Sequence, residues 1–248
     1  MKLKNKVAIV TGGAMGIGRA IAGRLAEEGA SVVVADLKGH EDAARAIGRG
    51  AIAVRCNVAY ETDVKAMVRA AKDAFGGVDI LVNNAGIYST LVPGPFDDIS
   101  VEEWKRVMDV NVLGSFLCAR EAVKAMRERG GGRILNVASG TPFKGVPYLL
   151  HYVTSKGAIV AMTKALAKEL GGANVLVNAV APGFTLSEGV KANPVQMEKL
   201  QEVSLKARTI PRDQVPEDIV GAAAFLVGPD SAFITGQTLV VDGGAYFH

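Results

Sequence analysis

The feature that most constrains the fold is an alternation of short apolar runs with segments of helical periodicity. Runs rich in Val, Ile, Leu and Ala occur at residues 7–10, 31–35, 51–55, 78–82, 133–138 and 175–180, and a last strand is expected at 238–241. They are almost continuously apolar, as strands covered on both faces are. In the first intervening segment Ile17, Ile21 and Leu25 recur every four residues, as on one face of a helix. These repeated units predict an α/β fold with a doubly wound parallel sheet of about seven strands and helices on both faces.

The chain length suits a single domain, with one segment that differs from the rest. A length of 248 residues is typical of one undivided α/β domain, and residues 1–248 contain no evident linker or low-complexity stretch. Residues 184–215 lie between strand and helix signals, include Pro194 and Pro211, and lack a regular pattern. Loops of this length are uncommon unless they have a function, so we expect an irregular lid over a substrate.

Composition and charge argue against several other functions. The formal net charge is only +3 without blocks of like charge, which disfavours nucleic-acid binding. Cys56 and Cys118 lie in apolar stretches without partners at ligand spacing, so we expect buried free thiols and no metal. The polar start of the chain runs directly into a strand, and no apolar run has the length of a membrane span. We therefore expect a cytoplasmic protein that does not bind membranes.

A glycine-rich turn, TGGAMGIG at residues 11–18, follows the first predicted strand and opens the first predicted helix. Glycines let the backbone approach a pyrophosphate, and the helix N-terminus offers free N–H groups. The second predicted strand ends at Asp36, where a carboxylate can accept hydrogen bonds from an adenosine ribose. That carboxylate repels a 2′-phosphate, and neither Met15 nor Leu37 supplies a cation for one. The sequence therefore predicts a site for NAD rather than NADP.

Residues of unusual type follow the predicted strands at the same end. Thr11, Asp36, Asn57, Asn83, Ser139 and Pro182 each lie at or just past the carboxyl end of a predicted strand. In an open parallel sheet those ends share one edge, where ligands bind. One site at this edge is therefore expected.

A tyrosine and a lysine four residues apart, Tyr152 and Lys156, open a segment of helical pattern. Side chains at this spacing share one face of a helix. A nearby ammonium lowers the pKa of a phenol, and a pKa nearer 7 would make Tyr152 a base for alcohol oxidation and an acid for carbonyl reduction. Ser139, at the end of the fifth predicted strand, can hydrogen-bond the same substrate oxygen.

Six short motifs occur in order, each after the element expected to position it. They are the glycine turn TGxxxGxG, the NNAG run 83–86, Asn111 within MDVNV, Ser139 with the YxxxK pair Tyr152 and Lys156, Pro182-Gly183, and the ending from Thr235 to Gly244. With this set, residues 3–244 resemble the short-chain dehydrogenase/reductase family. The resemblance implies a Rossmann-type fold and an oxidoreductase that acts on CH–OH groups with a nicotinamide cofactor.

The resemblance also implies roles for individual residues. Catalytic roles fall to Asn111, Ser139, Tyr152 and Lys156, with Lys156 also on the nicotinamide ribose and Asn111 supporting a water relay from Lys156 to solvent. Cofactor contacts are expected at Gly12, Met15, Gly16, Ile17, Gly18, Asp36, Leu37, Asn57, Val58, Asn83, Ala85, Gly86, Tyr152, Lys156, Pro182, Gly183, Thr185 and Ser187. Asn57 departs from the aspartate usual near the adenine, and Thr185 and Ser187 depart from the usual pattern beside the carboxamide.

A homotetramer is implied as well, with the helices that contain Asn111 and Lys156 packing between subunits. The terminal His248 is expected to be either part of an interface or a disordered end.

The substrate is constrained less than the reaction. Residues 141–150 are mostly apolar, and Ile87 and Tyr88 follow the NNAG turn, which favours a small apolar or aromatic secondary alcohol and its ketone. Substrate contacts are expected at Ser139, Thr141 and Tyr152. A 3-oxoacyl-thioester reductase is the alternative, although it would normally prefer NADP. A NAD-binding redox sensor without catalysis is the alternative outside enzymes.

Overall fold

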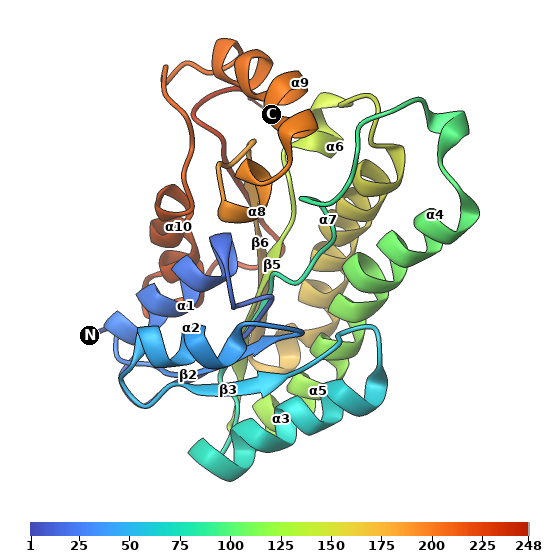
Figure 1. Ribbon diagram of the computed structural model, residues 1–248. Helices are drawn as coiled ribbons and strands as arrows, with labels where there is room; N and C mark the ends of the chain where they lie inside the picture. Colours follow the sequence, from blue (N-terminus) through green and yellow to red (C-terminus); the bar gives the residue numbers. More distant parts are fainter. Residues whose placement is uncertain (248) are drawn as a thin grey trace.

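Seven parallel strands form one sheet, as the sequence predicts (Figure 1). Their order is β3-β2-β1-β4-β5-β6-β7. The computed structural model describes residues 1–247, so the prediction for His248 lies outside the described residues. The strands are β1 (Val7–Thr11), β2 (Ser31–Asp36), β3 (Ile52–Arg55), β4 (Ile80–Asn83), β5 (Gly132–Val137), β6 (Val175–Pro182) and β7 (Thr238–Val241). Each predicted strand is confirmed to within two residues at either end.

The strand order reverses between β1 and β4. Strands β2 and β3 are added on one side of β1, and strands β5 to β7 are added on the opposite side of β4. The connections that follow β1 and β4 therefore run in opposite directions along the sheet. Such a reversal opens a crevice at the carboxyl ends of the strands, where ligands bind in doubly wound sheets. The central strands β1 and β4 are buried along their whole length, which explains why their sequences are apolar without alternation.

Helices cover both faces of the sheet. One face carries α1 (Gly16–Glu27), α2 (His40–Ile47) and α10 (Glu217–Val227); the other carries α3 (Glu61–Phe75), α5 (Gly114–Glu128) and α7 (Leu150–Leu170), with α4 (Val101–Met108) packed on α7. A π-helical turn, η2 (Asp109–Leu113), joins α4 to α5. Shorter turns are α6 (Thr141–Lys144), η1 (Phe96–Asp98), η3 (Gly171–Ala173) and η4 (Pro229–Ser231).

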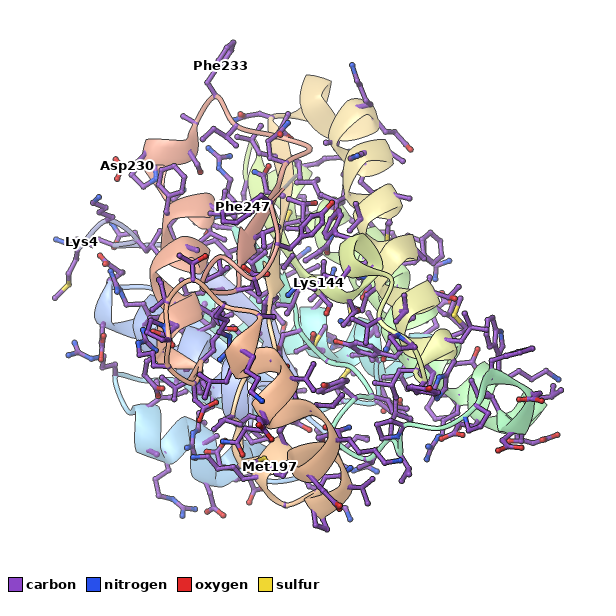
Figure 2. The ribbon with its side chains drawn as sticks, turned by 90° about the horizontal axis from the view of Figure 1, so that it is seen from above. Lys4, Lys144, Met197, Asp230, Phe233 and Phe247 are labelled. Carbon is purple, nitrogen blue, oxygen red and sulfur yellow. The ribbon has the colours of Figure 1, made fainter. Side chains whose placement is uncertain are left out.

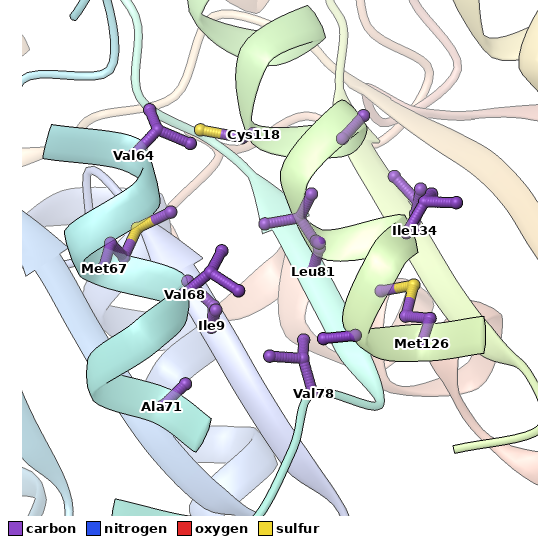
Figure 3. Packing of buried hydrophobic residues seen from close by; sticks show 14 of the residues in the cluster. Ile9, Val64, Met67, Val68, Ala71, Val78, Leu81, Cys118, Met126 and Ile134 are labelled. Carbon is purple, nitrogen blue, oxygen red and sulfur yellow. The ribbon is translucent and has the colours of Figure 1, made fainter. Parts of the chain in front are cut away.

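The larger of the two main core layers lies between the sheet and α3, α5 and α7. Val64, Met67, Val68 and Ala71 recur at helical spacing on α3, and together with Met126 of the neighbouring helix α5 they pack on the same face of the sheet (Figure 3). Burial of one large aliphatic side chain contributes about 1.5–3 kcal/mol. This layer therefore holds the strand ends, and the residues that follow them, in fixed positions.

The segment 184–215 is not the irregular loop that the sequence predicts. It contains α8 (Glu188–Lys191) and α9 (Pro194–Lys206), which lie above the carboxyl edge of the sheet (Figure 1). Asn193 caps α9 by accepting a hydrogen bond from the backbone N–H of Gln196 at 3.1 Å, and Pro194 takes the first helical position. Proline is favoured there because that position needs no N–H donor. The expectation failed because Pro194 starts a helix rather than interrupting one.

Residues 1–247 contain no helix whose length and hydropathy would let it cross a membrane. Within the same residues, His, Cys, Asp and Glu side chains do not gather in threes as metal ligands would. Cys56 and Cys118 are free and buried, which confirms that prediction.

Candidate active site

A cavity of about 1130 Å³ opens above the carboxyl ends of the strands. With two exceptions, the residues predicted as catalytic or as cofactor or substrate contacts line it. They are Gly12, Met15, Gly16, Ile17, Gly18, Asp36, Leu37, Asn57, Val58, Ala85, Gly86, Ser139, Thr141, Tyr152, Lys156, Pro182, Gly183, Thr185 and Ser187. The exceptions are Asn83 and Asn111, which lie behind the wall of the cavity.

The glycine turn, or glycine cradle, is so tightly packed that side chains at its glycine positions would clash with neighbouring backbone or require a strained conformation. Gly12 and Gly16 have φ of 62° and 54°, a region that favours glycine. A Cβ at Gly18 would lie 2.1 Å from the Gly12 carbonyl oxygen, and one at Gly12 would lie 2.8 Å from the Ala85 Cα. Asn84 holds the turn by donating hydrogen bonds to the Thr11 and Gly12 carbonyls at 3.0 and 2.9 Å. This close approach of backbone to the start of α1 fits a pyrophosphate group.

Asp36 lies at the end of β2, beside the glycine turn. Its carboxylate accepts hydrogen bonds from the Ala14 N–H at 3.1 Å and the Leu37 N–H at 2.7 Å. These two bonds fix the carboxylate at the cavity wall and leave further lone pairs free, since a carboxylate can accept about four. The arrangement fits the ribose hydroxyls of an adenosine.

Asn57 and Val58 line the cavity after β3. The Asn57 side-chain oxygen accepts a hydrogen bond from the Ala59 N–H at 3.1 Å, and the Asn57 N–H donates to Asp63 at 2.9 Å. These bonds shape the turn after β3. The asparagine therefore fixes the local backbone where the family usually has an aspartate.

Ser139, Tyr152 and Lys156 meet at the opposite part of the cavity. Ser139 follows β5, whereas Tyr152 and Lys156 lie on the first turns of α7. The Lys156 ammonium donates to the Val137 carbonyl at 2.7 Å and lies 5.9 Å from the centre of the Tyr152 ring. The Tyr88 ring packs on the Tyr152 ring with centroids 4.6 Å apart. The three side chains that the motifs single out therefore surround one small volume.

Burial shifts the pKa values of both ionisable groups in this cluster. It raises the pKa of Tyr152 to about 12, and a hydrogen bond with Ser139 opposes this rise. It lowers the pKa of Lys156 to about 8. The sequence predicts a Tyr152 pKa nearer 7 beside Lys156 and an oxidised nicotinamide; in this structure burial outweighs the Ser139 hydrogen bond, so the pKa of the phenol lies above its ordinary value.

Asn111 acts on the backbone around the cluster. Its side-chain oxygen accepts from the Ile87 N–H at 2.7 Å, and its amide donates to the Ser155 hydroxyl at 3.0 Å. Ser155 in turn donates to the Tyr152 carbonyl at 2.7 Å. Asn111 lies in η2, the π-helical turn between α4 and α5. In this structure it connects the loop after β4 with the start of α7.

Asn83 lies under the cavity floor. Its side-chain amide donates to the Asn136 side chain at 2.9 Å and to the Ser115 carbonyl at 3.3 Å. Asn136 donates onward to the Thr163 hydroxyl at 2.9 Å. The side chain of Asn83 therefore joins β4, β5 and the helices behind them, and the next residue, Asn84, lines the cavity.

One face of α9 forms part of the cavity wall. Leu200, Val203, Ser204 and Ala207 line the cavity at three- and four-residue spacing. This face does not follow from the predicted irregular segment 184–215, although the spacing of these side chains indicates a helix. Lys144, near the middle of the view onto this edge (Figure 2), pairs with the buried Asp242 at 3.0 Å.

The parallel sheet, the glycine cradle and the Ser139–Tyr152–Lys156 cluster together define an oxidoreductase with a Rossmann nucleotide-binding fold. More narrowly, the chain belongs to the short-chain dehydrogenase/reductase family, as predicted. A family model described as enoyl-(acyl carrier protein) reductase matches residues 12–246.

Relatives of known name support this assignment over the full chain. The chain is 39% identical to a 3alpha-hydroxysteroid dehydrogenase of Mediterraneibacter gnavus, covering 99% of this chain and 98% of the relative. It is 37% identical to a 3-oxoacyl-[acyl-carrier-protein] reductase of Staphylococcus epidermidis, covering 98% and 99%. The crystal structure of a 3-ketoacyl-(acyl-carrier-protein) reductase from Brucella melitensis complexed with NADH matches with a TM-score of 0.92 and 38% identity, covering 99% of this chain and 100% of that one.

Proposed function

We propose that this oxidoreductase interconverts a small, apolar or aromatic secondary alcohol and its ketone, with NAD(H) as cofactor. The observation that carries the proposal is the convergence of Tyr152, Ser139 and Lys156 in the same cavity as the glycine cradle and Asp36. The bound dinucleotide supplies or accepts the hydride at the carbinol carbon. All other steps fall to side chains of this chain.

Tyr152 moves the proton. In the reductive direction its hydroxyl donates a proton to the carbonyl oxygen, and in the oxidative direction its phenolate accepts the proton of the alcohol. Ser139 donates a hydrogen bond to the same oxygen and stabilises the charge that develops there. Lys156 binds the nicotinamide ribose and, with the positive charge of an oxidised nicotinamide, lowers the phenol pKa from the high value that burial imposes. Asn111 supports a water relay that returns the proton to solvent.

Asp36 favours NAD over NADP. Its carboxylate is fixed at the cavity wall by the Ala14 and Leu37 N–H groups, so it cannot easily turn away from a 2′-phosphate. Two anions held close together in a partly desolvated cleft are costly. The adjacent Leu37 offers no compensating cation.

The cavity chemistry supports an apolar substrate. Phe184, Leu200 and Val203 line the same cavity as Tyr152 and Ser139, and we propose α8 and α9 as the lid over it. His151–Lys156 and residues 233–239 resemble 1-phenylethanol dehydrogenase, whereas residues 189–194 resemble pyridoxal 4-dehydrogenase. These resemblances point to different substrates, so the proposal keeps to the broader class.

A 3-oxoacyl-thioester reductase is the second candidate. The Brucella melitensis protein is named as such a reductase and was crystallised with NADH. A preference of Asp36 for NAD over NADP is therefore a weaker argument against this candidate than the sequence suggests. The cytoplasmic location and the homotetramer remain predictions from the sequence.

An activity screen separates these functions. NADH absorbance is followed with aryl, alicyclic and steroid secondary alcohols plus NAD, and with a 3-oxoacyl thioester plus NADH. Turnover of the small aryl or alicyclic alcohols is expected to give the highest kcat/KM. Faster turnover of the thioester would favour the second candidate. NADH binding without turnover of any compound would indicate a redox sensor instead.

A further inference from the structure

An acidic side chain from α8 contacts the start of α1, where a cofactor phosphate would bind. One carboxylate oxygen of Glu188 accepts a hydrogen bond from the Gly16 N–H at 2.9 Å. The other oxygen pairs with the Arg19 guanidinium. Gly16 is the first residue of the 12-residue helix α1, so the carboxylate lies at the positive end of the helix dipole.

The residue before Glu188 also lies close to this point. A Cβ at Gly16 would be 3.0 Å from the Ser187 Cβ and 3.8 Å from a Glu188 carboxylate oxygen. Partial burial raises the pKa of Glu188, but the backbone hydrogen bonds and Arg19 together outweigh this and hold it below its usual value. Glu188 is therefore an anion at neutral pH, as a phosphate is. It accepts a hydrogen bond from a backbone N–H at the start of a helix, the kind of donor that binds phosphates.

We propose that Glu188 occupies the position of a cofactor phosphate and must leave the Gly16 N–H when a dinucleotide binds. The N–H groups at the start of a helix can satisfy one anion at a time, and two anions at that distance repel each other. Glu188 thus lowers the affinity of the protein for its cofactor. The inference rests on the proposed function only in taking a dinucleotide as the ligand.

The contact also ties cofactor binding to the substrate end of the cavity. Asn193, which follows α8, donates to the Ser89 and Leu91 carbonyls at 2.8 and 3.1 Å. The same loop carries Tyr88, which packs on Tyr152. When Glu188 leaves Gly16, segment 188–193 therefore loses a contact at one end, while Asn193 at its other end stays hydrogen-bonded to the loop beside Tyr152.

The test compares ligand binding by the full-length parent, Glu188→Gln and Glu188→Ala. Dissociation constants are measured for NADH by fluorescence, and for ADP and adenosine by calorimetry. Glu202→Gln is the matched control, because it removes the same charge from α9, where Glu202 pairs with the exposed Lys206. Melting temperatures of all variants check that they fold.

We expect the Kd for NADH and for ADP to fall by about tenfold in both Glu188 variants, which corresponds to about 1.4 kcal/mol. Adenosine, which has no phosphate, and the Glu202→Gln control should show no change. Unchanged or weaker NADH binding by the Glu188 variants would overturn the inference, as would an equal gain for adenosine. If the parent binds neither NADH nor ADP, the proposed function fails first and the inference fails with it.

Discussion

At the residue scale, the proposed chemistry depends on two buried ionisable groups, and burial shifts the pKa of each in the direction that favours its neutral form. Burial disfavours the phenolate of Tyr152 and the ammonium of Lys156, so each group is held nearer its neutral form than it would be in water. The sequence predicts which residues meet, because the spacing of four places both on one helix face. It does not predict the size of the burial effect, which depends on Tyr88 and the backbone packed around the pair.

The pH dependence of the two directions should therefore differ. In the proposed mechanism alcohol oxidation uses Tyr152 as a base, and because burial raises the pKa of this phenol, kcat/KM for oxidation should rise with pH through the alkaline range. Carbonyl reduction needs Tyr152 protonated and Lys156 charged, so it should be flat at low pH and fall above about pH 8 as Lys156 loses its proton. Ser139→Ala removes a bond that lowers the Tyr152 pKa and should move the oxidative rise to higher pH. An oxidation rate that falls between pH 7 and 9 would contradict this assignment.

Cofactor preference is a second property set by single residues. The parent should give a higher kcat/KM with NAD than with NADP. Asp36→Ala combined with Leu37→Arg removes the repelling carboxylate and adds a cation at the cavity wall, so it should shift the ratio toward NADP by about tenfold or more. Steady-state kinetics with both cofactors measure the ratio. Equal or better use of NADP by the parent would show that Asp36 does not select the cofactor.

At the element scale, the sequence predicts the strands far more accurately than it predicts the segments that connect them. β1 and β4 are buried on both faces, so a continuous apolar run identifies them without any tertiary information. α9 was missed because Pro194 looks like a helix breaker until Asn193 is recognised as its cap. The π-helical turn at Asn111 has no local signal of this kind, because contacts of Asn111 with Ile87 and Ser155 hold it in place.

The start of α1 gives a sharp test at this scale. Gly18→Ala would place a Cβ 2.1 Å from the Gly12 carbonyl, so it should distort the turn, lower the melting temperature and weaken NADH binding strongly. Gly23→Ala is the matched control on the same helix, since its added Cβ meets nothing within 4 Å among the described residues apart from its chain neighbours and the adjacent backbone of α1. It should stabilise the protein by about 0.5–1 kcal/mol through helix propensity, with NADH affinity unchanged. Similar behaviour of the two variants in denaturation and binding assays would refute the close-approach role of Gly18.

At the scale of the whole molecule, two separate faces carry exposed apolar side chains. Leu113 and Phe116 lie on η2 and α5, and Phe225 and Leu239 lie on α10 and the edge strand β7. Phe233, 104% exposed, projects away from the body of the molecule near the second face (Figure 2). Two distinct faces suit the two kinds of two-fold interface that a dihedral tetramer needs. The family resemblance predicts packing between subunits at the helices that contain Asn111 and Lys156, and the sequence offers no comparable signal for the second face.

The mass in solution tests the assembly. Light scattering should give four times the 25.8 kDa of one chain. Phe116→Glu places a charge on the α5 face and should halve that mass, whereas the exposed control Glu202→Gln should leave it unchanged. A parent mass close to that of a single chain would exclude the tetramer.

The whole account depends on the Tyr152 hydroxyl as the group that moves the proton, and Tyr152→Phe removes that oxygen while keeping the ring against Tyr88. Single-turnover and steady-state rates are measured alongside NADH affinity. We expect kcat to fall by about a thousandfold, within the range for loss of a general acid or base, while the Kd for NADH stays within about twofold. A variant that keeps activity within about tenfold of the parent would remove Tyr152 from the mechanism.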